Sequence, residues 1–246
     1  MIGTSSTSST SCTWCTRSSR TASDFVRMFQ DVRFWLWTLM IVGGFAYVAG
    51  CICGRHNPLA SREGGYSELV KLLISAPLLF FLGPRLNLES DDAGWRRIPM
   101  RNGFGYFLFF FGGLQWELLQ HIPHVNYSLK WSDLSNMHPT GRAVFLTGAL
   151  VILALAAYHC RLARKQGILV PYISTFLGGI LLLVAISWVV RDRYYYHIHH
   201  YFLFGYFIPW TRFKNPVSLA CQGFSTGVYV EGISEWSMAA LWYSLS

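Results

Sequence analysis

The stretch ILVPYISTFLGGILLLVAISWVV, residues 168–190, contains no charged residue and consists mainly of Leu, Ile and Val. About 20 consecutive apolar residues suffice for an α-helix to cross the hydrocarbon core of a bilayer. In that environment the backbone must satisfy its own hydrogen bonds, which a helix does. The stretch therefore predicts a membrane-spanning helix and sets the fold class.

The composition of the whole chain agrees with this prediction. Of the 246 residues, 52% are hydrophobic and 13% are charged, whereas soluble domains carry about 25% charged residues. Similar apolar blocks recur along the chain, so we expect an all-α, polytopic transmembrane helix bundle of six or seven spans without a sizeable soluble domain. The expected spans are Phe34–Cys53, Leu69–Leu82, Gly103–Leu119, Ala143–His159, Ile168–Val190, Tyr194–Trp210 and Val217–Tyr243.

The first 32 residues differ from the rest of the chain. They are rich in Ser and Thr and contain no acidic residue before Asp24, a composition similar to that of organellar transit sequences. We expect residues 1–32 to form a tail and residues 33–246 to form the membrane domain. The tail favours the mitochondrial inner membrane as the location, with an endomembrane or the plasma membrane as the alternative.

The formal net charge of +8 comes from basic residues that gather between the predicted spans. If the N-terminus lies inside and seven spans cross, most Lys and Arg residues fall in the inside loops, as membrane topology generally requires. Contact with anionic lipid headgroups explains such a charge. We expect bound lipid and no nucleic-acid partner.

Ionisable residues within spans are costly and usually mark function or internal pairing. Three groups occur here: Glu117 with His121 and His124, His197 with His199 and His200, and Glu231 with Glu235. The spacing of the first group predicts a single stripe on an α-helix, and His197 and His200 are expected to share a helix face. In the seven-span topology all three groups reach the outer interface.

Imidazoles with one or two carboxylates suit Zn or non-haem Fe. The predicted metal ligands are His197, His199, His200, His121 and Glu117. The interpretation that we favour over a metal site is that these interfacial side chains only form structural hydrogen bonds. Haem ligation or contact with a quinone is a further alternative. Known nucleophile, phosphate-binding and dinucleotide-binding motifs are absent from the sequence.

The C-terminal third carries an ordered set of short motifs. They are HIHHYFLFGYFIPWTRF at 197–213, Ser218, QG at 222–223 and GVYVEGISEW at 227–236. Together they resemble a polytopic membrane region of fungal and protist proteins, some of which also contain an LCCL domain, although Glu231 stands where that pattern has Asn. The resemblance implies a membrane module and directs attention to Arg212, Gln222 and Trp236 in addition to the histidines.

The function predicted from these features is that of a noncatalytic accessory subunit in a larger membrane complex, such as an organellar energy-converting assembly. The first alternative is a metal-dependent membrane enzyme that acts on a lipidic substrate through the His/Glu cluster. A transporter is the second alternative. The predicted partners are membrane lipids and the protein subunits of that complex. Arg212 is expected to contact Gln222 or a headgroup, while Glu231 and Glu235 are expected to face the histidines.

Overall fold

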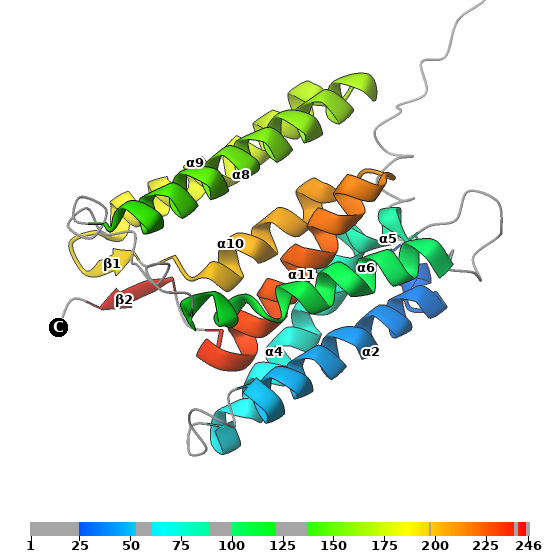
Figure 1. Cartoon of the computed structure of the whole chain (residues 1–246), viewed down its shortest axis with the longest axis horizontal. Helices are drawn as coiled ribbons and strands as arrows, with labels where there is room; N and C mark the ends of the chain where they lie inside the picture. Colours follow the sequence, from blue (N-terminus) through cyan, green and yellow to red (C-terminus); the bar gives the residue numbers. More distant parts are fainter. Residues whose placement is uncertain are drawn as a thin grey trace, which may run out of the picture.

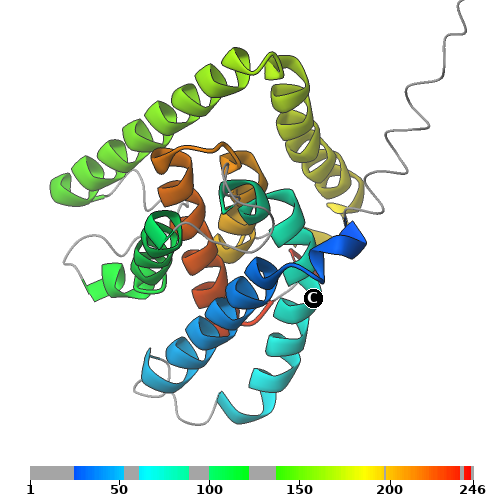
Figure 2. The same cartoon turned by 90° about the vertical axis from the view of Figure 1, so that its right-hand side faces the viewer.

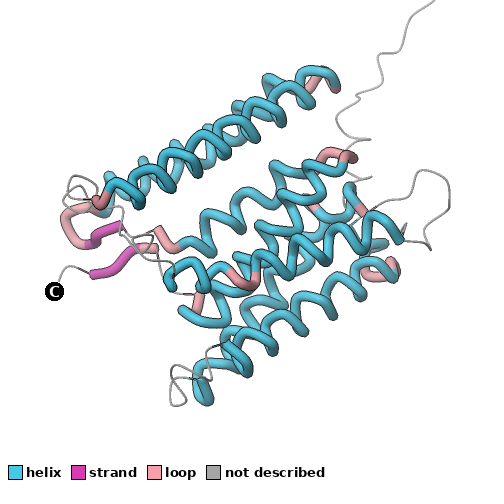
Figure 3. The backbone as a smooth tube through the Cα atoms, in the orientation of Figure 1, coloured by secondary structure: helices cyan, strands magenta, loops and turns pink. Residues whose placement is uncertain are grey.

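The computed structural model describes residues 25–52, 61–88, 100–121, 137–196, 198–238 and 241–244, with the backbone alone at 61–65, 100–101 and 119–121. Helices make up most of this chain (Figure 1, Figure 3). The α-helices are α2 (Val32–Tyr47), α4 (Ser61–Leu82), α5 (Pro84–Asn87), α6 (Met100–Gly113), α8 (Pro139–Lys165), α9 (Leu169–Val190), α10 (His200–Phe207) and α11 (Pro216–Trp236). A π-helix, η1 (Val48–Ile52), and two 3-10 helices, η2 (Trp116–His121) and η3 (Ile208–Thr211), extend α2, α6 and α10. The predicted helical fold class is confirmed.

Helices α2, α4, α6, α10 and α11 form the helical body of the molecule around α11. Three helices of this body run in the same direction. The Trp37 indole donates to Tyr106 Oη at 3.1 Å, and Tyr106 Oη lies 2.7 Å from Thr226 Oγ1, so one polar chain links α2, α6 and α11. Further along, Ser234 Oγ donates to the Phe45 carbonyl at 3.1 Å. All three helices therefore end on the same side of the body.

Helices α4 and α10 run against α11. On α4, Ser75 Oγ lies 2.8 Å from Tyr229 Oη, whereas Glu68 reaches the backbone N–H of Met238, beyond the end of α11. On the α10 side, Gln222 Nε2 donates to the Ile208 carbonyl at 3.0 Å. Neighbouring segments of the chain thus alternate in direction, as short connections between packed helices require.

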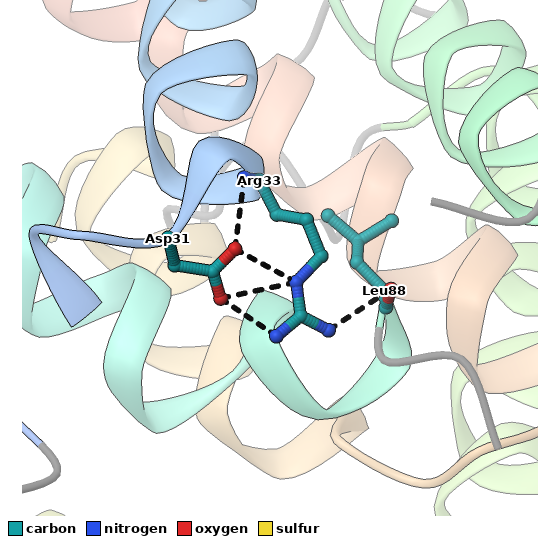
Figure 4. A network of polar contacts seen from close by, with 3 residues as sticks. All are labelled: Asp31, Arg33 and Leu88. Atoms are coloured by element: carbon teal, nitrogen blue, oxygen red, sulfur yellow. Dashed lines mark hydrogen bonds and ion pairs between the residues drawn. The ribbon is translucent and has the colours of Figure 1, made fainter. Parts of the chain in front are cut away.

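The beginning of α2 is fixed by a buried ion pair (Figure 4). Asp31 accepts a capping hydrogen bond from the backbone N–H of Arg33 and contacts the guanidinium through both carboxylate oxygens, the shortest contact being 2.6 Å. Arg33 Nη1 also donates to the Leu88 carbonyl at 3.4 Å. Both side chains are almost fully buried, so the pair joins α2 to the end of α5. Phe25 and Met28 also pack into this core.

Helices α8 and α9 stand apart from the body. Figure 2 shows them meeting at their short connection and then diverging. Their junction is held by a small cluster in which Ala163 and Tyr172 pack on Phe213, and by the bond between Ser218 Oγ and His159 Nε2 at 2.9 Å. Beyond the junction, α9 touches the body through Tyr206, while Thr140–Leu155 of α8 contains one buried residue, Gly141.

Three of the described helices are long and apolar enough to cross a membrane. They are Val32–Ile52, which combines α2 and η1, Pro139–Lys165 and Leu169–Val190. These helices match three of the seven predicted spans. Length and composition of the described helices do not establish the remaining spans.

Two predicted spans have different limits in the structure. Tyr194–Tyr196 is a strand, β1, that pairs antiparallel with β2 (Trp242–Ser244), and α10 begins only at His200. Three consecutive tyrosines favour a strand, and Tyr195 stacks on Tyr243 at a centroid distance of 5.4 Å. At the other end, α11 stops at Trp236 because Ser237 adopts a positive φ of 64°. The prediction of continuous helices over Tyr194–Trp210 and Val217–Tyr243 was therefore wrong.

Candidate metal centre

Three glutamates meet at the end of the body where α6 and α11 finish. Glu117 comes from η2, and Glu231 and Glu235 lie one turn apart on α11. One carboxylate oxygen from each residue lies within 4.8 Å of the other two. We refer to Glu117, Glu231 and Glu235 as the acidic cluster.

Close packing between α6 and α11 brings Glu117 to this position. A side chain at Gly223 would lie 2.6 Å from the Tyr106 carbonyl, and side chains at Gly113 and Gly227 would collide with the backbone of the opposite helix. Small residues allow this separation between helices in a bilayer. Because Gly113 is the last residue of α6, the chain leaves that helix directly beside α11, and Glu117 follows four residues later.

The acidic cluster is partly buried and incompletely hydrogen bonded. Glu231 is 1% exposed, and Glu117 and Glu235 are half-buried. One carboxylate oxygen of each residue, Oε2 of Glu117, Oε1 of Glu231 and Oε2 of Glu235, is buried without a hydrogen-bond partner. A buried polar atom without a partner costs about 1–3 kcal/mol, and more when it is charged.

Three carboxylates at this separation repel one another when they are charged. Two unit charges 4.8 Å apart repel by on the order of 3 kcal/mol at an effective dielectric constant of about 20. A bound cation would relieve this repulsion.

His200 connects the acidic cluster to α10. Its Nε2 lies 3.1 Å from Glu231 Oε2, and its side chain is 29% exposed. Gly232 makes this approach available, because a side chain there would lie 2.6 Å from His200 Nε2 and 2.7 Å from Tyr201 Cβ. His200 thus connects the buried Glu231 to the molecular surface.

The other predicted histidines are not brought to the acidic cluster. His199 Nε2 lies 2.8 Å from Tyr243 Oη, so this imidazole contacts the residue that follows Trp242 in β2. His197 and His124 lie outside the described residues, as does the side chain of His121. The prediction that His197 and His200 share a helix face depends on His197, which is not described; α10 begins at His200, with the extended residue His199 as its N-cap.

The predicted stripe formed by Glu117 and His121 also differs from the structure. Both residues belong to a 3-10 helix, η2, rather than to an α-helix. With three residues per turn, positions i and i+3 align, whereas positions i and i+4 point about a third of a turn apart. The physical reason is that α6 ends at Gly113 and the chain turns more tightly beyond it.

Arg212, Gln222 and Trp236 lie outside the acidic cluster. Gln222 is buried, donates to the Ile208 carbonyl and accepts a hydrogen bond from Asn87 Nδ2 at 3.0 Å. These contacts, rather than the predicted contact with Arg212, occupy the Gln222 amide. Arg212 follows η3 at the opposite end of α11, and Trp236 is 52% exposed.

Glu68 is a fourth carboxylate at this end of the body, and it differs from the acidic cluster because its oxygens have hydrogen-bond partners. Glu68 lies directly before the predicted span Leu69–Leu82, and it accepts hydrogen bonds from Lys71 Nζ at 2.7 Å, from the Met238 N–H at 2.6 Å and from Ser67. Burial alone would raise the pKa of Glu68, but these hydrogen bonds and the Lys71 charge together hold the pKa below its ordinary value. Among the described residues, no Lys or Arg forms an ion pair with the acidic cluster, and its one ion-pair contact is the one between Glu231 and His200.

The donor set suits a divalent metal ion. Carboxylate oxygens bind Mg²⁺, Ca²⁺ and Mn²⁺, whereas the addition of an imidazole extends the choice to Zn²⁺ and Fe²⁺. Glu117, Glu231 and Glu235 could supply three ligands and His200 a fourth. All four residues were among the candidates predicted from the sequence. Gly232, which permits the approach of His200, was not, and only its position in the G-I-x-x-W motif could have drawn attention to it.

Comparison with protein-family models, with curated proteins and with solved structures finds no match to this chain. The resemblance to the membrane region of LCCL-containing proteins therefore stays a prediction. The molecule is defined by its own features: a helical protein with three helices suited to cross a membrane and a partly buried cluster of carboxylates.

Proposed function

We propose that this chain is a multi-pass membrane protein that binds one divalent metal ion through Glu117, Glu231 and Glu235, with His200 as a further ligand. The observation that carries the proposal is the meeting of one buried and two half-buried carboxylates within 4.8 Å, each with a buried, unpartnered oxygen. Ionisable side chains inside a membrane protein are costly, and function is the usual reason for keeping them.

Such a site could support the reaction of a metal-dependent membrane enzyme, the first alternative predicted from the sequence. A divalent ion next to the exposed part of His200 would polarise a carbonyl or activate a water molecule, and a lipid ester or amide is the substrate class within reach of a membrane interface. If one of the three carboxylates does not bind the metal, it could act as the general base. We assign this role to Glu117, because it lies on a short 3-10 helix, whereas Glu231 and Glu235 lie on the long helix α11.

The seven-span topology with the N-terminus inside is part of this proposal. Helices α2, α6 and α11 run in one direction and α4 and α10 in the other, which seven alternating segments require. Basic residues lie before α11 and at the end of α8, whereas the acidic cluster lies at the end of α11. The rule that Lys and Arg accumulate inside then places the acidic cluster on the outer side.

Metal analysis of the purified protein tests the proposal. We expect about one ion per chain after exposure to Zn²⁺, Mn²⁺ or Fe²⁺ and removal of excess metal, with loss of that ion in Glu231→Gln and Glu235→Gln. Glu68→Gln is the matched control, because Glu68 lies at the same end but has its own partners, and it should retain the ion. A wild-type protein that retains no ion from this panel would contradict the proposal.

A noncatalytic accessory subunit of a larger membrane complex is the second candidate function. The observation that favours it is the uncovered surface of α8, of which Thr140–Leu155 leaves nearly every residue exposed. Protein subunits could pack there in place of lipid. Metal-free protein that co-purifies with a stoichiometric set of partners would support this function instead.

A further inference from the structure

The end of the molecule opposite the acidic cluster carries a group of basic side chains from two segments. Arg161, Arg164 and Lys165 belong to the last turns of α8, and Arg212 and Lys214 precede α11. Arg212 is half-buried, and the other four residues are exposed. We refer to these five residues as the basic junction.

Packing holds the two segments of the basic junction together. Ala163, which is fully buried, packs with Tyr172 and Phe213, so the end of α8 lies beside the segment that precedes α11. Tyr172 Oη donates to the Trp210 carbonyl at 2.8 Å, two residues before Arg212. The cations of both segments therefore gather at the same end of the molecule, and Arg164 is the α8 cation whose position on the helix lies closest to the side that carries Ala163.

Helix stability does not explain all five charges. Arg164 and Lys165 stand at the C-terminus of α8, where the helix dipole favours cations. Arg212 and Lys214 stand before the N-terminus of α11, where the dipole disfavours them. Within the described residues, no carboxylate forms an ion pair with Arg161, Arg164 or Lys165. An external anion would relieve this accumulation of positive charge.

The surroundings of the basic junction indicate which anion fits. Directly along α8 from the junction, the surface is apolar and uncovered, with Leu150, Val151 and Leu153 more than half exposed. A ligand that matches both the positive charge of the basic junction and this apolar surface has a phosphate group attached to long hydrocarbon chains.

We propose that the basic junction binds the phosphate-bearing headgroup of an anionic phospholipid, whose acyl chains lie along the exposed face of α8. Arg164 contacts the headgroup from α8, and Arg212 and Lys214 contact it from the start of α11, while Arg161 and Lys165, on the other side of α8, add to the positive potential at this end. The site is independent of the acidic cluster, because the two groups lie at opposite ends of α11. Bound lipid then fixes α8 against the body at its otherwise small junction.

Thermal unfolding of the full chain in a neutral detergent tests this site, with native mass spectrometry to count retained lipids. Titration with phosphatidylglycerol should raise the unfolding midpoint at lower lipid concentrations than titration with phosphatidylcholine. Each basic residue near an anionic surface contributes about a fivefold gain in affinity. Arg164→Gln with Lys165→Gln should therefore weaken phosphatidylglycerol binding by roughly ten- to thirtyfold.

The matched control is Arg191→Gln with Arg193→Gln, which removes two exposed charges from the other end of α9 and should leave phosphatidylglycerol binding unchanged. If the Arg164/Lys165 variant does not fold, Lys214→Gln alone and the wild-type protein in 1 M salt provide the same test. Both should weaken phosphatidylglycerol binding. In 1 M salt the Debye length is about 3 Å, so attraction between exposed charges that lie farther apart is largely screened. Equal protection by phosphatidylcholine, equal loss in the control variant or equal protection by inorganic phosphate would each overturn the proposal of a phospholipid site.

Discussion

The helical body and the α8–α9 pair are built from opposite kinds of residue. In α11, most residues between Ser218 and Ile233 are buried, and they include Gln222, Thr226 and Glu231. In α9, which is one residue longer than α11, Tyr172 is the one buried residue, and nearly all others are apolar. The body packs small and polar groups against protein, whereas the pair presents aliphatic side chains outward.

This difference explains which helices are identified as candidate membrane spans from their hydropathy. Both α8 and α9 meet the criterion for a membrane span, but α11 does not, although its 21 residues are sufficient in length. A helix surrounded by other helices can carry Gly, Ser, Gln and Glu, because protein partners satisfy them. The helices with the strongest hydropathy, α8 and α9, are therefore those with the least protein around them, and the candidate site lies on segments of weaker hydropathy.

The largest expected effect comes from breaking the buried ion pair of the body. Asp31→Asn leaves Arg33 buried without a carboxylate, and loss of one partner in such a pair costs about 3–5 kcal/mol in the free energy of unfolding. Asp192→Asn at the end of α9 is the control, because Asp192 is 89% exposed and its contact with Arg191 is 3.7 Å long. Thermal unfolding in detergent measures both. Equal stability of the two variants would contradict the assigned difference between body and pair.

Replacement of helix glycines should give the next largest difference. Gly227→Ala places a methyl group against Phe110 O and Gly113 of α6, which forces the two helices apart and should cost about 1–3 kcal/mol. Gly148→Ala in α8 meets no atom within 4 Å, and Ala has the higher helix propensity, so this variant should be neutral or slightly more stable. If Gly227→Ala also unfolds at the wild-type temperature, α6 and α11 are not in the contact described.

The smallest effect is the pH dependence that Glu68 gives to the body. Its folded-state pKa lies below the ordinary value of 4.5. The stabilisation is therefore complete above about pH 4.5 and is lost as the pH falls through the lower folded-state pKa. The stability difference between wild type and Glu68→Gln should be constant from pH 7 to 5 and should shrink below pH 4.5. A difference that persists unchanged to pH 3 would contradict the hydrogen bonds from Lys71 and Met238.

Much of this architecture follows from the sequence. Uninterrupted aliphatic runs place α2, α8 and α9 to within a few residues, because a helix in lipid needs only length and apolar side chains. The sparse ionisable residues also identified the members of the acidic cluster, since Glu117, Glu231 and Glu235 stand out against an apolar background. Their arrangement in space, however, depends on packing between segments more than 100 residues apart.

Local departures from regular helices could not be predicted in the same way. The 3-10 turn at Trp116–His121 rotates Glu117 relative to His121, and it depends on where α6 ends against α11. Strand β1 exists because Trp242–Ser244 returns to pair with it. Gln222 bonds to Asn87 across 135 residues of sequence. Each feature is set by a tertiary partner that local composition does not reveal.

The central claim is that the chain crosses the membrane back and forth and separates the basic junction from the acidic cluster. The most direct measurement is labelling of single cysteines in sealed vesicles with a membrane-impermeant maleimide, after the six native cysteines are replaced by serine. The account predicts that Lys165→Cys and Lys214→Cys react from one side and that Arg193→Cys reacts from the other. Labelling of Lys165→Cys and Arg193→Cys from the same side would contradict it.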